Sequence, residues 1–462
     1  MARHDGTGEQ NGMDRSDGSE EPVESIRDRL RSARARSDAA REPDLLPSRQ
    51  GRRQYSVKAL VERIIAQFID EHGQSESAPV RAAHTEADRL KLIRDAADYV
   101  IAVESIQVTS AERAEIIRQV YAEMFSYGPL DDLLADPALT TISLEGADKL
   151  AVRRGHADLT PLAPVFEDEE HVRRVIRRLV EDAGARLDET TPLIEAGLKV
   201  AGRRVSVNVV GPPAAVLTTA DIRLHPVQPP TLDDLVRGEV MPPLAADLLD
   251  ALARSAHGLV VVGESESGKT TLLGVLARLM PLEQRARLVA VERAGELALP
   301  EEASRRVVQW QTDQHPGLSF ADRVNEALAL GPTCLLLDEV RADEAAAVGP
   351  LLAEGAVPPQ MWAFRGPADA KRLASSLGML ARRSDPASGE AAVHRLYERL
   401  PFVVTLRRRQ GKLLLHQVSE WQYPPGADYP DQVELLAQGW HGLERTGNRP
   451  QHPLDLPDVF WV

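Results

Sequence analysis

The sequence predicts an α/β protein whose core is a mainly parallel sheet covered on both faces, preceded by a small α+β domain and a helical module. Three observations lead to this prediction. After Thr231, near-continuous apolar strands alternate with helical stretches, the pattern of a parallel sheet buried on both sides. Between Tyr127 and Pro226, short β-like runs surround one amphipathic helix. Before Tyr127, three amphipathic runs with helical spacing follow one another.

Composition and charge narrow the class of protein. The 462 residues are 43% hydrophobic, enough for cores in two or three domains. The net charge of −15 argues against binding nucleic acid by broad electrostatic attraction, so no nucleic-acid partner is expected. A single cysteine, Cys334, excludes a disulfide framework and fits a reducing compartment. We find neither an apolar run of about 20 residues nor the apolar region of a signal peptide. We therefore expect a cytoplasmic chain that reaches the inner face of the cell membrane only through a partner.

Changes in composition and in the pattern of apolar residues along the chain predict five segments. Residues 1–52 are rich in Gly, Ser and charged residues, so we predict a disordered tail with a fragile charged helix over Glu24–Ala35. Residues 425–462 are rich in Pro, Gly and Asp and are predicted to wrap a domain surface or to reach a neighbour. Between these tails we predict a helical module over 53–126, an α+β domain over 127–226 and a strand–helix domain over 227–424.

The helical module is predicted from three apolar faces. Apolar residues recur with a helical period over 57–68, 90–101 and 116–125. Thr109 with Glu112 forms a capping box at the start of the third helix. We interpret the module as a packing unit rather than a ligand site.

The two following domains are predicted from short apolar strands. A helix with apolar residues from Val172 to Leu179 lies among the first strands, and the prolines from Pro226 to Pro230 mark a stiff linker. A second helix is predicted over Thr270–Leu279. The predicted strands are Thr141–Leu144, Lys149–Val152, Arg204–Val210, Leu259–Val262, Leu288–Val291, Val307–Gln311, Leu335–Leu337, Phe402–Leu406 and Leu413–Val418.

The most specific motif is Gly263-Glu264-Ser265-Glu266-Ser267-Gly268-Lys269-Thr270, which fits the phosphate-binding loop G-x-x-x-x-G-K-[ST] between a buried strand and a helix. Backbone N–H groups and the helix N-terminus face phosphate oxygens, Lys269 reaches the β- and γ-phosphates, and the Thr270 hydroxyl ligates Mg²⁺. The carboxylates of Glu264 and Glu266 would weaken binding if they faced the phosphates. We predict that ATP binds here with Mg²⁺. The predicted binding residues are Gly263, Ser265, Ser267, Gly268, Lys269, Thr270 and Thr271.

Acidic residues follow two of the predicted strands. Leu335–Leu337 runs into Asp338 and Glu339, and we predict that Asp338 holds the Mg²⁺ shell while Glu339 orients the attacking water. The alternative is a strand followed by a solvated acidic turn. A second strand ends at Glu292, a weak signal on its own.

Several stretches carry a resemblance to a known family. Gly128–Pro137 is similar to the entry of that family's N-terminal domain, and Pro192–Val205 to its sheet edge. Val291–Leu297 resembles its Asp box, and Glu339–Arg341 with Glu344 resembles its Walker B segment. The family is that of the secretion (traffic) ATPases of type II and type IV secretion and of type IV and Flp pili, especially the CpaF-like branch.

The resemblance implies a RecA-like core in a two-domain subunit of a homo-hexamer, with nucleotide held between the domains and ATP hydrolysis moving them. It also implies an inner-membrane platform protein of a pilus or secretion system as partner. By the same resemblance, Glu292 becomes a catalytic acid or water positioner, with Glu339 beside the metal. Arg204 and Arg223 match basic positions that approach phosphates.

The sequence also departs from the family. Ala356 and Phe364 stand where the family has two histidines, and Arg293 replaces the second acid of the Asp box. An arginine supplied to the γ-phosphate can be worth about 10³–10⁵ in rate, so losing such charges could leave binding intact while hydrolysis collapses. Residues at the positions of the family's arginines before the Walker B strand are Asn325, Ala329 and Gly331.

Two functions therefore stay open. The first is an active ATPase that powers pilus assembly or protein secretion, which Lys269, Thr270 and Glu339 favour. The second is a regulatory or structural subunit that binds ATP with little or no hydrolysis, which the missing histidines and arginines favour. A DNA-translocating motor is disfavoured by the acidic balance.

Overall fold

A computed structural model describes residues 45–46, 55–72, 78–155, 157–299, 308–311, 319–409, 412–440 and 442–461. The chain divides into two compact units, one ending at Phe125 and the other beginning at Ser126. The predicted helix over Glu24–Ala35 and nearly all of the predicted tail lie outside the described residues. In the described piece of that tail, β1 (Leu45–Leu46) pairs antiparallel with β2 (Tyr55–Ser56).

The first unit is helical, as the apolar periodicity predicts. Its helices pack around one core formed by Leu60, Ile64, Phe68, Ile93, Ile116 and neighbouring apolar residues. The predicted capping box is present: Thr109 N–H donates to Glu112 Oε2 at 2.6 Å, and Glu112 N–H donates to Thr109 Oγ1 at 3.2 Å. The helices are α2 (Val57–His72), α3 (Ala78–Ala82), α4 (Glu86–Val103) and α5 (Ser110–Phe125).

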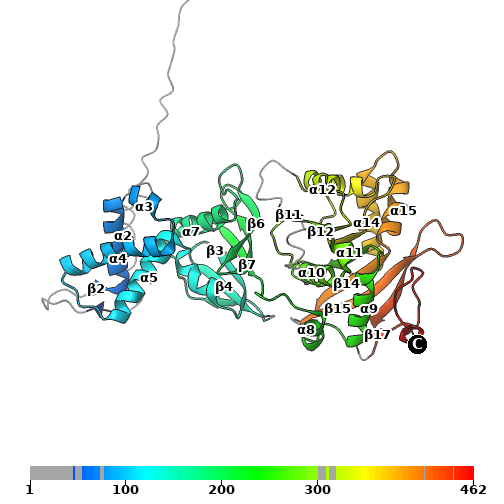
Figure 1. Ribbon diagram of the computed structural model, residues 1–462, viewed down its shortest axis with the longest axis horizontal. Coiled ribbons are helices and arrows are strands. Elements are labelled where there is room, and N and C mark those ends of the chain that lie inside the picture. Colours follow the sequence, from blue (N-terminus) through cyan, green and yellow to red (C-terminus); the bar gives the residue numbers. More distant parts are fainter. Residues whose placement is uncertain are drawn as a thin grey trace, which may run out of the picture. The chain divides into compact units, whose positions relative to one another are not determined.

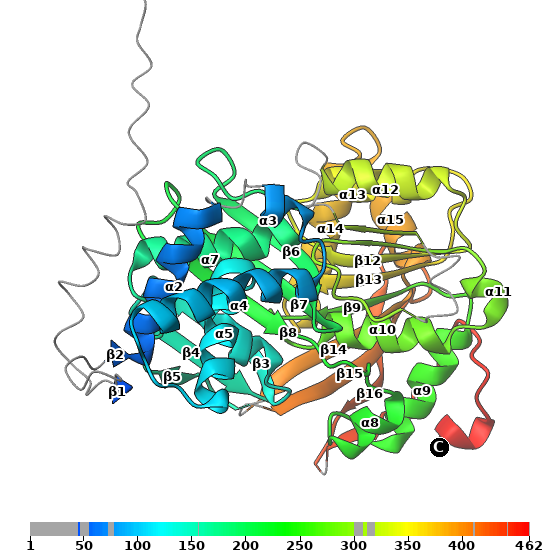
Figure 2. The same ribbon diagram turned by 60° about the vertical axis from the view of Figure 1, so that its left-hand side comes forward.

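The second unit begins with a six-stranded antiparallel sheet in the order β5-β4-β3-β8-β7-β6 (Figure 2). Helix α7 (Glu169–Asp182) buries its apolar face in the same core as the sheet, because Val172, Ile176 and Leu179 recur on one side of it. Short helices η1 (Gly128–Leu130) and α6 (Asp131–Ala135) precede the sheet. The strands are β3 (Leu139–Glu145), β4 (Lys149–Arg154), β5 (Thr160–Leu162), β6 (Leu193–Val200), β7 (Arg203–Val210) and β8 (Thr219–Leu224).

The larger sheet has nine strands in the order β11-β10-β12-β13-β9-β14-β15-β16-β17 (Figure 1). Pairing is parallel from β11 through β14 and antiparallel beyond, so the predicted mainly parallel sheet is confirmed. Strand β13 was missing from the sequence prediction, and Val307, the first residue predicted for β11, lies outside the described residues. The strands are β9 (Leu259–Gly263), β10 (Leu288–Glu292), β11 (Val308–Gln311), β12 (Cys334–Val340), β13 (Gln360–Arg365), β14 (Phe402–Arg409), β15 (Lys412–Gln422), β16 (Asp431–Gln438) and β17 (Leu443–Arg445).

Helices cover both faces of the larger sheet, which explains why its central strands are apolar throughout. In β9, Leu259 and Val261 enter one core with α9 and α10, while Val260 and Val262 enter another with α12 to α15. The helices are α8 (Leu232–Arg237), α9 (Pro243–Arg254), α10 (Lys269–Leu279), α11 (Leu282–Arg285), α12 (Phe320–Ala329), α13 (Ala345–Val348), η4 (Gly349–Leu351), α14 (Ala370–Ser384), α15 (Gly389–Arg399) and η5 (Asp458–Trp461).

The C-terminal residues join this sheet, which the prediction of a surface-wrapping tail did not foresee. Two strands, β16 and β17, extend its antiparallel edge. After β17, the chain is tied to β15 through the fully buried Glu420. The Glu420 carboxylate accepts hydrogen bonds from the backbone N–H groups of Gln451 and His452 at 2.7 and 2.8 Å. Phe460 and Trp461 then pack into the core beside α9.

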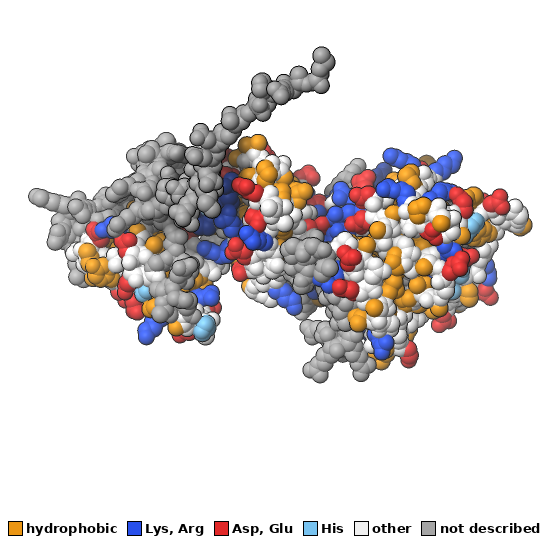
Figure 3. All heavy atoms as spheres, turned by 90° about the horizontal axis from the view of Figure 1, so that it is seen from above, with side chains coloured by type: hydrophobic (Ala, Val, Ile, Leu, Met, Phe, Trp, Pro, Cys, Tyr) orange, Lys and Arg blue, Asp and Glu red, His pale blue; other side chains and the backbone are white. Residues whose placement is uncertain are grey.

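The surface of the described residues is of mixed charge on the face shown in Figure 3, where acidic and basic side chains are interspersed. Among the described helices, none combines the length and the apolar character that crossing a bilayer requires. The parallel strands β9, β10 and β12 all end at one edge of the sheet, where loops leaving parallel strands commonly form ligand sites.

Candidate nucleotide-binding site

The loop between β9 and α10 has a backbone that only glycine accommodates at two points. Gly268 has a φ of +84°, and a Cβ there would lie 2.5 Å from a methyl carbon of Leu413. A Cβ on Gly263 would lie 2.3 Å from Ser267 Oγ and 2.9 Å from the carbonyl oxygen of Leu406. The two glycines of the motif thus let the chain turn tightly from strand to helix.

Lys269 begins α10 and points back over the loop. Its side chain is only 4% exposed, and its Nζ donates to the carbonyl oxygen of Glu264 at 2.8 Å. The same Nζ forms an ion pair with Glu339 at 2.8 Å. A buried ammonium requires a negative partner, and here the carboxylate predicted to orient water provides it.

Thr270 and Asp338 join α10 to the end of β12. Thr270 Oγ1 donates to Asp338 Oδ1 at 3.0 Å. Burial raises the pKa of Asp338 to about 8, and the negative charge of nearby Glu296 adds to that rise. An aspartate that resists ionisation in the ligand-free site would ionise readily beside a cation.

These oxygen donors fit Mg²⁺ in the way that nucleotide sites use it. In the part of the chain that the structure describes, His, Cys, Asp and Glu side chains make no cluster of three or more that could hold a metal. Mg²⁺ is usually bound by one or two protein oxygens together with phosphate oxygens and water. Thr270 and Asp338 suit that arrangement, in which the protein supplies only some of the ligands, rather than a site in which protein side chains supply all of them.

Glu292 ends β10 directly opposite Asp338 in the parallel register. Its side chain is fully buried, Oε2 accepts the backbone N–H of Leu297 at 2.8 Å, and Oε1 has no hydrogen-bond partner among the described residues. Burial, followed by the charges of Asp338 and Glu296, raises its pKa well above the ordinary value. The open Oε1 leaves a place for a water molecule or a proton, the chemistry expected of a general acid or water positioner.

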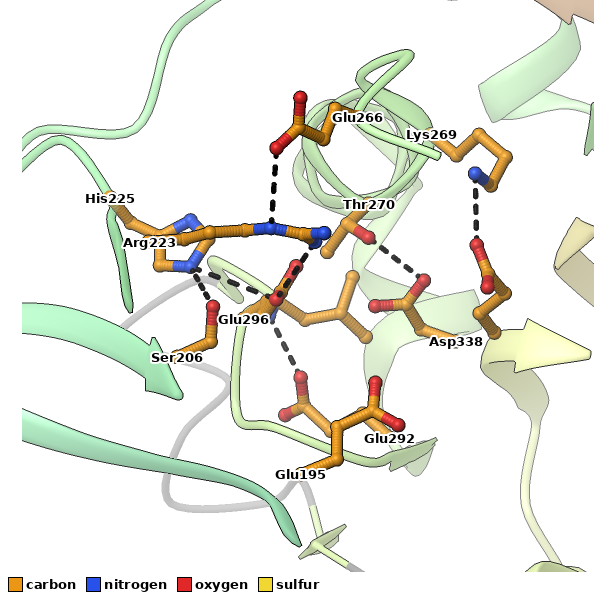
Figure 4. A network of polar contacts seen from close by, with 12 residues as sticks. Glu195, Ser206, Arg223, His225, Glu266, Lys269, Thr270, Glu292, Glu296 and Asp338 are labelled. Carbon is orange, nitrogen blue, oxygen red and sulfur yellow. Dashed lines mark hydrogen bonds and ion pairs between the residues drawn. The ribbon is translucent and has the colours of Figure 1, made fainter. Parts of the chain in front are cut away.

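Arginines from the six-stranded sheet meet this cluster. Arg223 on β8 lies 3.8 Å from both Glu266 and Glu296 (Figure 4). Arg204 on β7 has a buried Nε without a partner among the described residues, and burial lowers its pKa while the charge of Glu292 opposes that shift. Both predicted arginines therefore belong to the same group of charges as the loop.

The remaining predicted loop residues differ in exposure. The Ser267 hydroxyl is buried and has no partner among the described residues, whereas Ser265 and Thr271 are exposed. Two residues of the cluster had no role in the prediction. Arg153 pairs with Glu266 at 2.7 Å across 113 positions of sequence, and Glu296 lies 3.9 Å from His225. No local pattern could have brought β4 to the loop.

Comparison with known proteins agrees with this geometry. Residues 123–350 match the family model described as "Type II/IV secretion system protein". This match and the similarity to VirB11 support a place for the chain in the type II/IV secretion ATPase superfamily. It is 29% identical over 238 residues to a putative conjugal transfer protein of Mycobacterium tuberculosis, covering 49% of this chain and 66% of that relative, just under two thirds of its length.

This chain has two further, more distant relatives. It is 24% identical over 257 residues to the type IV secretion system protein VirB11 of Brucella suis, covering 50% of this chain and 70% of that protein. Among solved structures, it is similar to the ATPase DotB of Legionella pneumophila, with a TM-score of 0.45 and 15% identity over 62% of this chain and 78% of that one.

The departures from the secretion ATPase pattern have defined surroundings. Arg293 forms an ion pair with Glu344 and lies over the ring of Phe320, 4.5 Å from its centroid. Phe364 is fully buried on β13 beside β9. Asn325 is exposed and donates to the carbonyl oxygen of Ala321. These positions serve packing and internal pairing in this chain.

Proposed function

We propose that this secretion ATPase binds ATP with Mg²⁺ at the loop from Gly263 to Thr271 and hydrolyses it to drive pilus assembly or protein secretion. The observation that carries the proposal is the convergence of Lys269 and Thr270, at the start of the helix after β9, with Asp338 and Glu339 near the carboxyl end of β12. Backbone amides, a buried ammonium and oxygen donors for a cation together suit a polyphosphate.

Each predicted residue takes a role in this proposal. Lys269 would bind the phosphates, and Thr270 and Asp338 would hold Mg²⁺, which would supply positive charge beside the phosphate oxygens. Glu339 must leave Lys269 before it can orient a water molecule, and Glu292 assists as acid or water positioner. The predicted cofactor-binding residues of the loop and the arginines Arg204 and Arg223 surround the phosphates.

The wider setting follows from the family. We propose a homo-hexamer of the CpaF-like branch that works in the cytoplasm against an inner-membrane platform protein, peripheral to the membrane through that partner. We also propose the five-part division of the chain, with boundaries after residues 52, 126, 226 and 424, in which the last part completes the sheet of the fourth with β16 and β17. Its relatives include a putative conjugal transfer protein and a type IV secretion system protein, and both support export machinery as the setting.

A second function is favoured by specific observations. Arg293 and Phe364 occupy positions where the family carries an acid and a histidine, and Lys269 is already paired with Glu339. These features favour a nucleotide-binding regulatory or structural subunit with little or no hydrolysis.

Steady-state phosphate release by the purified full chain separates the two functions. We expect the wild type to release phosphate from Mg·ATP and Lys269→Ala and Glu339→Gln to lose that release. Lys91→Ala is the control, since this exposed lysine lies on α4 in the first compact unit. Lys269-dependent ATP binding with no turnover above the variants would establish the regulatory subunit. Absence of any Lys269-dependent nucleotide binding in folded protein would refute both.

A further inference from the structure

Glu266 occupies a loop position that its backbone makes costly for a glutamate. Its φ is +59°, in the left-handed region that glycine adopts readily and other residues rarely do. The strain persists in the middle of the phosphate-binding loop, where surrounding contacts must hold it. The contacts of the Glu266 side chain are therefore the place to look for its role.

The carboxylate of Glu266 holds arginines from the other sheet. Arg153 Nη1 on β4 donates to Glu266 Oε2 at 2.7 Å, and Arg223 Nε on β8 lies 3.8 Å from Oε1. Arg408 Nη2 on β14 donates to the backbone carbonyl of Glu266 at 3.2 Å. The side chains of Arg153 and Glu266 are only 16% and 32% exposed, so water screens this pair incompletely.

A phosphate bound in the loop would need the same arginines. Arg153 and Arg223 already touch a loop residue, and a polyphosphate cradled by the loop amides adds negative charge beside them. Arginine binds carboxylate and phosphate oxygens with the same fork of donors. Three cations near the loop are thus already paired with carboxylates: Lys269 with Glu339, Arg153 with Glu266, and Arg223 with Glu266 and Glu296.

We propose that Glu266 is a built-in competitor for the nucleotide's phosphates, which holds Arg153 and Arg223 in the ligand-free chain and releases them when a nucleoside triphosphate binds. The inference rests on the proposed function, because it describes how that same site is regulated. Binding then exchanges one anion for another on these arginines, so the wild type binds ATP more weakly than a chain with an uncharged residue at 266. When Arg153 and Arg223 leave Glu266, the ion pairs that join the loop directly to β4 and β8 are lost.

The test is the affinity of the full chain for Mg·ATP, measured by isothermal titration calorimetry on wild type, Glu266→Gln and Glu266→Gly. Glutamine keeps the size of the side chain and removes its charge, and glycine also removes the backbone strain. We expect both variants to bind Mg·ATP about tenfold more tightly, a change of about 1.4 kcal/mol. An affinity that is unchanged within twofold, or weaker, overturns the inference.

A second arm tests whether the arginines carry the effect. In an Arg153→Gln background, we expect the gain from Glu266→Gln to fall to threefold or less, because a main shared partner is gone. A full tenfold gain in that background overturns the inference, since Glu266 would then act by repulsion alone. If no variant with Lys269 intact binds Mg·ATP while thermal unfolding shows it folded, the proposed function itself fails. Lys269-dependent binding by the wild type without the gain refutes only the role of Glu266.

Discussion

We expect the replacement of Asp338 by asparagine to stabilise the ligand-free protein, and to do so far more at pH 8 than at pH 5. Asparagine has nearly the same shape, keeps an oxygen that accepts the Thr270 hydroxyl, and has no charge to bury. In the wild type, burial and the charge of Glu296 raise the pKa of Asp338 to about 8, from an ordinary value of 3.8. The folded state therefore keeps a proton that the unfolded state has already lost.

The sign and size of the effect follow from that difference. Because the folded state binds more protons between pH 4 and pH 8, the free energy of unfolding of the wild type falls as pH rises through this range. One pKa unit is worth about 1.4 kcal/mol. The part of the difference between the unfolded and folded pKa values that lies below the solution pH is roughly one unit at pH 5 and about four units at pH 8. The advantage of the Asp338→Asn variant is thus expected to grow by about 3–4 kcal/mol between the two pH values.

Urea unfolding without Mg²⁺ or nucleotide, followed by tryptophan fluorescence, measures this difference. Trp362 is buried on β13, next to β12, and reports on this domain. Asp234→Asn is the matched control: hydrogen bonds from the backbone and hydroxyl of Thr231 lower the pKa of Asp234 to about 2, so it is ionised in both states across the range. Its difference from wild type stays constant. An advantage of Asp338→Asn that does not grow with pH would refute the reasoning.

Three further predictions concern buried polar groups. Arg203 donates to the carbonyl oxygens of His225, Asp136 and Leu139 at 2.8, 2.8 and 2.5 Å, so Arg203→Met is expected to cost about 2–4 kcal/mol in urea unfolding, with Arg203→Lys in between. Glu420→Ala leaves the amides of the C-terminal segment without their acceptor, and limited proteolysis is expected to remove that segment faster than in the wild type; equal rates contradict this. Burial raises the pKa of Cys334 to about 12, so iodoacetamide is expected to leave it unmodified in folded protein at pH 8 and to modify it in urea, as mass spectrometry would report.

The need to bind a ligand explains why Asp338 and Glu292 lie where their burial destabilises the ligand-free fold. Both carboxyl groups are buried next to one another, burial and the charge of Glu296 raise the pKa of both, and the charge of Asp338 further raises the pKa of Glu292. A cation and a polyphosphate would convert that cost into binding energy, because the ionised forms then acquire partners. Sites of this kind trade stability for function.

Local sequence patterns were sufficient for much of the fold. Helical spacing in the first unit, the apolar strands β9, β10 and β12, and the glycine–lysine loop each depend on neighbours within a few residues, which the sequence displays directly. Strand β13 was missed because its run from Gln360 to Arg365 lay in the stretch compared with the family's histidine motif. The strands β16 and β17 were missed because Pro and Gly dominate the composition around them.

The sequence by itself determined the phosphate-binding loop, the acids at the carboxyl ends of β10 and β12, and the mainly parallel sheet that carries them. Only the tertiary structure decided which charges meet. Arg153 reaches Glu266, Glu339 pairs with Lys269, and Glu292 is fully buried with one oxygen open. The physical reason is that periodicity and motif spacing describe contacts along a strand or helix, whereas these contacts join elements that are far apart in the sequence and meet only on folding.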